Sequence, residues 1–130
     1  MKTATYGRTV TQSEVNKFAE ISGDDNPIHV DREAAKDSMF GRRVVHGALT
    51  TSYVSAALAD VGDSIVLLSL DMSYESPVYP GDRVEVTVTP TIHLSDNRCE
   101  VDVEVRVPGR DERSVASSGT AIIMDMGGDK

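Results

Sequence analysis

Positions 24 to 29 bring together a carboxylic acid, an amide, a rigid proline and an imidazole, from Asp24, Asn26, Pro27 and His29. An imidazole with an ordinary pKa of about 6.5 can accept a proton at neutral pH, and a carboxylate beside it can orient it and handle a second proton. Pro27 restricts the backbone, which favours convergence of Asp24 and His29 on one water molecule. The segment therefore predicts a general acid/base pair. The alternative is a structural loop, because Asp and Asn commonly end helices and Pro is common in loops.

A possible oxyanion donor lies further along, where His46 and Gly47 precede a long uncharged stretch. If that stretch is a helix, Gly47 contributes one of the backbone N–H groups left free at a helix N-terminus, where a developing oxyanion is stabilised. An acid/base pair and an oxyanion donor suit a reaction that adds or removes water beside a carbonyl, because charge collects on the oxygen while protons move at the two carbons. For His46 itself we expect a turn or packing role.

A helix is expected directly before the acid/base segment. Thr11 and Glu14 have the spacing of a capping box. Apolar residues follow at helical intervals until Gly23, which is a typical helix stop. The pattern predicts an amphipathic helix over residues 12–22.

Two further helices are expected beyond it. Residues 24–29 are too polar and too constrained for a helix interior, so we expect a loop there. Asp31 is a candidate cap for a short helix over residues 32–36. Residues 47–61 carry no charge until near their end and have small or apolar residues on every face, which indicates a helix covered on all sides.

The second half of the chain has the alternation of half-buried antiparallel strands. We expect strands over residues 65–74, 84–89, 99–107 and 114–124, and an edge strand over 3–9. Helices early and strands late indicate an α+β fold. An antiparallel sheet wrapped around one long helix is the arrangement called the hot dog fold.

The length of 130 residues fits one domain, which we assign to residues 1–130 with a flexible tail at 125–130. A sheet of about five strands with open edges commonly dimerises, so we expect a homodimer, and a monomeric mass in sedimentation would count against it.

Composition excludes some classes of partner. The formal net charge of −8 argues against nucleic acid, and the longest uncharged stretch, residues 44–59, is too short and too polar to cross a membrane. Residues 1–10 do not resemble a secretory signal and Cys99 has no partner cysteine, so we expect a cytoplasmic protein with an inert, buried thiol. Thirteen of the 21 acidic residues are Asp and nine of the 13 basic residues are Arg, which is compatible either with a salt-adapted host or with an ordinary acidic protein.

Three segments resemble the MaoC-like, (R)-specific enoyl-CoA hydratases. Residues 22–29 (SGDDNPIH) are similar to the hydratase motif of that family, residues 40–49 (FGRRVVHGAL) to its second block, and residues 76–82 (SPVYPGD) to its third. The matches come in the family's order, and the resemblance covers the chain from about residue 6 to residue 124. The first block is highly specific, whereas the third is common among hot dog proteins.

The resemblance implies a homodimeric hot dog enzyme that reversibly hydrates trans-2-enoyl-CoA to (R)-3-hydroxyacyl-CoA, with no metal or cofactor. It places Asp24 and His29 as the catalytic dyad and the backbone N–H of Gly47 as the oxyanion donor. The substrate class that follows is an acyl-CoA thioester.

Other residues are weaker candidates. Asn26 is assigned to supporting the loop or ligand, with a structural role as the alternative, and Ser55 to the site face of the long helix, with close packing as the alternative. Arg42 and Arg43 form a cationic pair that can meet the phosphates of coenzyme A, or can be solvated charges.

Two other functions remain open from the sequence, because fold does not determine function. Hot dog proteins also hydrolyse acyl thioesters, so one alternative is an acyl-CoA thioesterase. The other is a non-catalytic acyl-CoA binding module. The intact Asp24 and His29 pair favours the hydratase, although a carrier-protein thioester or an unusual acyl group remains compatible with the same residues.

Overall fold

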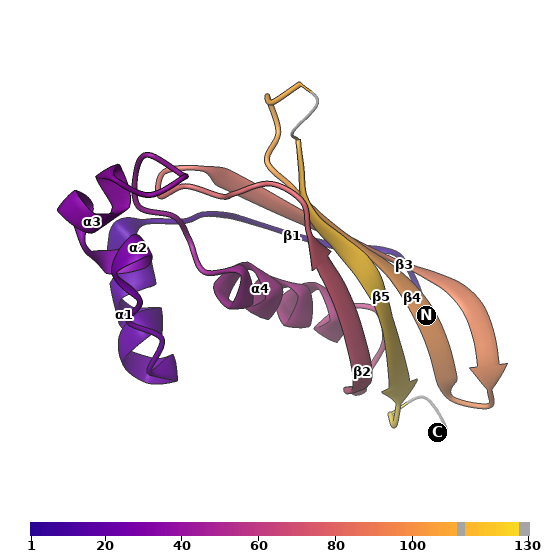
Figure 1. The fold of residues 1–130 in the computed structure, drawn as a ribbon. Helices are drawn as coiled ribbons and strands as arrows, with labels where there is room; N and C mark the ends of the chain where they lie inside the picture. Colours follow the sequence, from indigo (N-terminus) through magenta and orange to yellow (C-terminus); the bar gives the residue numbers. More distant parts are fainter. Residues whose placement is uncertain (112–113, 128–130) are drawn as a thin grey trace.

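The computed structural model describes residues 1–111 and 114–127. Within them, one antiparallel sheet curves over one long helix, with three shorter helices grouped at one end (Figure 1). In chain order the elements are β1 (Ala4–Thr9), α1 (Gln12–Ser22), α2 (Pro27–Val30), α3 (Arg32–Lys36), α4 (Gly47–Ala59), β2 (Ile65–Tyr74), β3 (Arg83–Ser95), β4 (Arg98–Arg106) and β5 (Val115–Asp125).

The sheet has the order β1-β3-β4-β5-β2, so β1 and β2 are its edges. The predicted alternation is confirmed: Val84, Val86 and Val88 of β3 are fully or almost fully buried, and they pair with β4 through contacts such as Val86 opposite Val105. β3 extends beyond the predicted 84–89 because its register shifts near Pro90, which lets the strand continue past a residue that cannot donate a ladder hydrogen bond.

α4 packs against the sheet and completes the predicted hot dog fold (Figure 1). Val54, Ala57 and Leu58 are buried beneath the strands. The prediction that this helix is buried on all sides is wrong for the single chain, because Ser52 and Ser55 of α4 are exposed. The small side chains on this uncovered face explain why the sequence lacks a polar stripe.

The N-terminal helices hold the acid/base segment. The predicted capping box of α1 is present, since Thr11 Oγ1 accepts from the backbone N–H of Glu14 while Glu14 Oε1 accepts from the N–H of Thr11. The expected loop at residues 24–29 is partly wrong, because its end belongs to α2. Asn26 caps this single turn and Pro27 occupies its first turn. Proline is tolerated there because the backbone N–H that it lacks has no hydrogen-bond partner within the helix at that position.

The predicted C-terminal tail begins inside the last strand of the sheet. Of residues 125–130, predicted as a tail, Asp125 ends β5, and the N–H of Met126 donates to the carbonyl of Ser64. Residues 128–130 lie outside the described residues. In the part of the chain that the structure describes, no helix has the length and apolar character needed to cross a membrane.

Candidate active site

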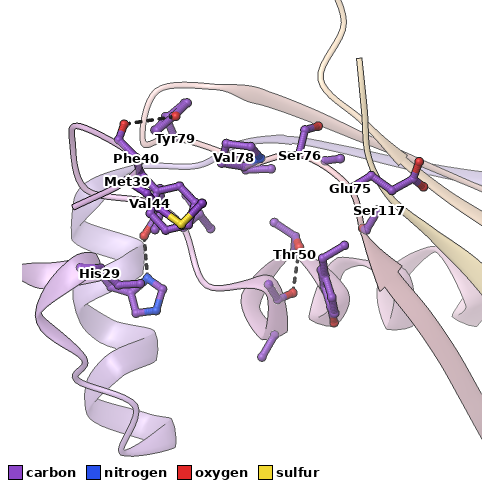
Figure 2. Close-up of a pocket in the computed structure, with 17 residues that line it drawn as sticks. His29, Met39, Phe40, Val44, Thr50, Glu75, Ser76, Val78, Tyr79 and Ser117 are labelled. Atoms are coloured by element: carbon purple, nitrogen blue, oxygen red, sulfur yellow. Dashed lines mark hydrogen bonds between the residues drawn. The ribbon is translucent and has the colours of Figure 1, made fainter. Parts of the chain in front are cut away.

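His29 lies on α2 with its side chain only 8% exposed. Its Nδ1 is 2.8 Å from the backbone carbonyl oxygen of Val44 (Figure 2). A carbonyl oxygen only accepts hydrogen bonds, so Nδ1 carries the proton and, in the neutral ring, Nε2 carries the lone pair. The backbone therefore fixes the tautomer that a general base at Nε2 requires.

Asp24 lies just after α1 and its side chain is exposed. Its backbone N–H donates to Ser22 Oγ at 3.0 Å, and its Oδ1 accepts from the N–H of Asn26 at 3.4 Å. One potential ligand atom from each of Asp24, His29 and His46 lies within 4.8 Å of the other two. The predicted acid and base are thus neighbours, and a water molecule can contact both.

His46 joins the two halves of this group. Its Nε2 donates to the carbonyl oxygen of Asp24 at 2.8 Å, and its ring stacks on that of His29 with centroids 3.8 Å apart and planes tilted by 22°. Phe18 of α1 packs edge-on against the His46 ring, with centroids 4.8 Å apart. Burial lowers the pKa of His46, and the nearby His29 lowers it further, against an opposing effect of the Asp24 carbonyl. His46 is therefore held neutral.

Gly47 begins α4, and its helix N-terminus has no side-chain cap, because His46 at the N-cap position makes no capping hydrogen bond. Its backbone lies against the ring of Tyr74, where a Cβ atom would come within 2.8 Å of Cε1. Tyr74 is anchored in turn by a 2.7 Å hydrogen bond between its hydroxyl and Thr51 Oγ1. The uncapped N–H groups can therefore receive an oxygen of a ligand.

A cavity of about 740 Å³ is lined by both His29 and Gly47, whereas Asp24 and His46 are not among its lining residues (Figure 2). Its volume lies within the range of small-molecule sites. The walls come from α2, residues 39–50, the end of β2 with the segment after it, and the start of β5. They include His29, Phe40, Gly47, Thr50, Tyr74, Val78, Tyr79 and Ser117.

The predicted arginine pair lies beside this cavity. The guanidinium of Arg42 lies 3.8 Å from the centroid of the Tyr79 ring, one of the cavity walls. Arg42 and Arg43 also line a separate cleft of about 370 Å³, together with Arg32 and Lys36 of α3. Sequence reasoning missed the last two, because they are ten and six positions before Arg42 and only the turn after α3 brings them near it.

The structure supports different roles for the remaining candidate residues. Asn26 caps α2 through a 3.4 Å hydrogen bond from the N–H of Ile28, which supports its structural role. Ser55 is exposed on α4 and is not among the residues lining the cavity. Ser117, which no sequence pattern singles out, lines the cavity with a buried hydroxyl that has no hydrogen-bond partner among the described residues. Its neighbourhood depends on the pairing of β5 with β2, which no local pattern reveals.

The chain matches known proteins over most of its length. The family model described as a MaoC like domain matches residues 1–111. The 3-hydroxybutyryl-CoA dehydratase of Methylorubrum extorquens is 34% identical over 132 residues, covering 93% of this chain and 84% of that protein. The (R)-specific enoyl-CoA hydratase of Rhodospirillum rubrum is 33% identical over 92 residues, covering 69% of this chain. The chain spans 64% of that relative's length.

A solved structure agrees with these sequence matches. The (R)-hydratase from Aeromonas caviae involved in PHA biosynthesis superimposes with a TM-score of 0.86 at 28% identity. The superposition covers 95% of this chain and 93% of that one. The similarity therefore includes the helices that carry the acid/base segment as well as the sheet.

Proposed function

The chain belongs to the MaoC-like dehydratase family, and on that premise we propose that it reversibly hydrates trans-2-enoyl-CoA to (R)-3-hydroxyacyl-CoA. The observation that carries this proposal is the geometry of His29. Its Nδ1 donates to the Val44 carbonyl oxygen, which leaves the lone pair of the neutral ring on Nε2, and His29 lies near Asp24 and in the wall of a cavity. Relatives with hydratase and dehydratase names support the reaction class.

The dyad acts on one water molecule. Asp24 accepts a hydrogen bond from the water and orients it, and His29 Nε2 takes its proton as the oxygen bonds to C3 of the enoyl group. The pair then delivers a proton to C2. The double bond thus gains a hydroxyl group at C3 and a hydrogen at C2, and dehydration runs through the same steps in reverse.

Gly47 stabilises the charge that develops during this step. As water adds to C3, negative charge moves to the thioester oxygen, and an N–H group at the start of α4 can donate to it. The absence of a side-chain cap leaves this position available to substrate. We assign Arg42 and Arg43, beside the cavity, to the phosphates of coenzyme A.

A homodimer would cover the two surfaces that the single chain leaves open. The edge strand β2 exposes Val66, Leu67 and Leu68, which are 37–43% accessible, and the adjacent α4 exposes the small residues Ser52 and Ser55. The opposite edge, β1, is shorter and carries the charged Arg8, which discourages strand addition. We infer that two copies pair through β2, and that the resulting enzyme works in the cytosol, where a single buried Cys99 stays reduced.

The proposal is tested by mixing the protein with crotonyl-CoA and following the loss of enoyl-thioester absorbance. We expect hydration to the (R)-3-hydroxy product, with its configuration determined by chiral analysis. A thiol-release assay on the same samples should stay at background. Thiol release without hydration would instead establish the thioesterase alternative, and tight binding with neither reaction would establish a binding module.

A further inference from the structure

One hydroxyl group in the cavity wall differs from the others. In the described part of the chain, five residues of this wall carry a hydroxyl group. Four of these hydroxyls form hydrogen bonds with protein atoms: those of Thr50, Tyr74, Ser76 and Tyr79. The fifth, on Ser117, has no partner among the described residues, although Ser117 is only 1% exposed. A buried hydroxyl without a partner costs free energy, because it has lost its hydrogen bonds to water. In the wall of a cavity, such a group is available to a ligand.

The pairing of β5 with β2 places Ser117 close to the reaction centre. Ser117 lies directly opposite Tyr74 in the ladder, so the two side chains lie on the same face of the sheet. The ring of Tyr74 packs in turn against Gly47, where a Cβ atom would come within 2.8 Å of it. All three residues line the cavity. Ser117 is therefore separated from the proposed oxyanion donor by a single side chain.

Ser117 also lies away from the side of the cavity assigned to coenzyme A. Figure 2 shows Tyr79 and Phe40 on one side of the cavity and Ser117 on the other. Arg42, assigned above to the phosphates, stacks on Tyr79. With the phosphates beside Tyr79 and the thioester oxygen at Gly47, the acyl chain beyond the double bond extends towards Ser117.

The side chains around Ser117 suit an uncharged acyl group. Among the described residues that line the cavity, none is Lys or Arg. The carboxylate of Glu75 accepts a 2.6 Å hydrogen bond from Ser118, which follows Ser117 in β5 and so lies on the opposite face of the sheet. An acyl carboxylate would therefore be buried without a cation, which is costly. A serine hydroxyl both donates and accepts hydrogen bonds, so it can pair with a neutral oxygen.

We propose that Ser117 is a specificity-determining residue that recognises enoyl groups carrying an uncharged oxygen, a hydroxyl or a keto group, beyond the double bond. The inference rests on the proposed function. Such an oxygen pairs with Ser117 Oγ, so both polar groups are satisfied in the complex. A plain alkyl chain leaves Ser117 unpaired. A site that hydrogen-bonds a substrate hydroxyl discriminates against the analogue that lacks it.

The test compares pairs of substrates in which a terminal hydroxyl replaces a methyl group of similar size. One pair is 5-hydroxy-trans-2-pentenoyl-CoA and trans-2-hexenoyl-CoA, and the other is 6-hydroxy-trans-2-hexenoyl-CoA and trans-2-heptenoyl-CoA. For each pair, the kcat/KM of the hydroxylated substrate is divided by that of the alkyl substrate. In at least one pair, Ser117→Ala should lower this ratio by about five- to tenfold relative to wild type. A ratio that is unchanged or raised in both pairs would overturn the proposal.

The matched control is Ser118→Ala, which removes a hydroxyl from the next position of β5, outside the lining of the cavity. Its ratios should match those of wild type. Equal lowering of the ratio in both variants would reflect a general effect on β5 and would also count against Ser117.

Thermal unfolding separates recognition of substrate from a structural role. Because Ser117→Ala removes a hydroxyl that has no partner in the protein, its melting temperature should be no lower than that of wild type. A clear decrease would mean that the hydroxyl is paired within the protein, and the proposal would then be wrong.

Titration calorimetry keeps this inference distinct from the proposed function. The saturated counterparts of the four thioesters have no double bond to hydrate, so they report binding alone. In at least one pair, Ser117→Ala should lower the affinity for the hydroxylated thioester, relative to its alkyl counterpart, by about five- to tenfold. Equal relative affinities in both proteins would rule out recognition by Ser117. Failure to hydrate any enoyl thioester would refute the proposed function, whereas these binding measurements would still decide about Ser117.

Discussion

The stacked rings of His29 and His46 divide two tasks between two imidazoles. With centroids 3.8 Å apart, the rings would repel each other if both were charged. His46 is the more buried and uses Nε2–H to hold the Asp24 carbonyl, and its Nδ1 is enclosed with no hydrogen-bond partner among the described residues, whereas His29 lies in the wall of the cavity. The arrangement therefore leaves His29 as the imidazole that lines the cavity.

The dyad assignment gives the first prediction. Asp24→Asn removes the carboxylate and His29→Ala removes the base, so each should lower kcat/KM for crotonyl-CoA by about 100- to 10,000-fold. Both variants should keep the far-ultraviolet circular dichroism and the mass of the wild type. The matched control is Asp25→Asn, an exposed acid next to Asp24, which should stay within about twofold of wild type. Near-wild-type rates in Asp24→Asn or His29→Ala would remove the assignment.

His46 gives a prediction about stability and pH. Its folded pKa is lowered by burial and by His29, so the unfolded chain binds a proton more readily. The stability that neutral His46 contributes is complete above its unfolded pKa of about 6.5 and is lost as the pH falls below that value. The urea-unfolding free energy of wild type should therefore decrease between about pH 7 and pH 5 more steeply than that of His46→Gln.

The control for this comparison is His93→Gln, because His93 is exposed on β3. Its slope of unfolding free energy against pH should match the wild type. Asp24 and His29, the titratable groups beside His46, are retained in both variants. A His46→Gln slope identical to wild type would show that His46 does not resist protonation.

Some of these residues can be predicted from the sequence and others cannot. Asp24 and His29 can be predicted because a carboxylate and an imidazole at this spacing are typical of a general acid/base pair. Gly47 can be predicted because it lies at the start of a long uncharged stretch. The stacking of His46 on His29 depends on how the start of α4 meets α2, which local spacing does not encode. The sequence therefore predicts only a turn or packing role for His46, and its hydrogen bond to Asp24 adds a second role.

At the scale of elements, the main errors of sequence-based prediction arise because local patterns do not include the effect of flanking residues or of packing against other elements. The pattern at residues 24–29 predicts a loop because Pro27 forbids a helix interior, yet proline at the first turn starts α2. The absence of a charged face on α4 predicts a helix that is buried on all sides. In the single chain, however, the face with the small residues Ser52 and Ser55 is exposed. Four of the five predicted strands agree with the structure to within one residue at each end, since half-burial imposes a period of two, whereas β3 is longer than predicted.

Gly119 shows how closely β5 passes β2. A Cβ atom at this position would overlap the backbone oxygen of Asp71, which neither strand can move without breaking the ladder. We expect Gly119→Ala to lower the free energy of unfolding by about 3 kcal/mol or more. Thr120→Ala, which alters the neighbouring exposed residue of β5, should lower it by under about 1 kcal/mol. Urea denaturation measures both, and equal losses would contradict the packing argument.

For the whole molecule, the order of elements predicts one hot dog domain, and the structural match confirms the fold. The cavity cannot be predicted from the sequence, because its walls come from four segments separated along the chain.

The acidic composition leaves salt adaptation as a prediction. If the protein is salt-adapted, its melting temperature should rise from low to multimolar KCl. A protein that is no more stable in concentrated KCl is not salt-adapted.

Dimerisation through β2 is a prediction about the assembled enzyme. Leu68 is 41% exposed on this edge, so Leu68→Lys can be tolerated by the single chain but places an unpaired charge where the partner's β2 would pack. We expect wild type to sediment as a dimer and Leu68→Lys as a folded monomer with reduced activity. Leu94→Lys, on β3, is the matched control because Leu94 is 46% exposed and lies away from the β2 edge. A monomeric wild type, or dissociation by Leu94→Lys alone, would show that β2 is not the interface.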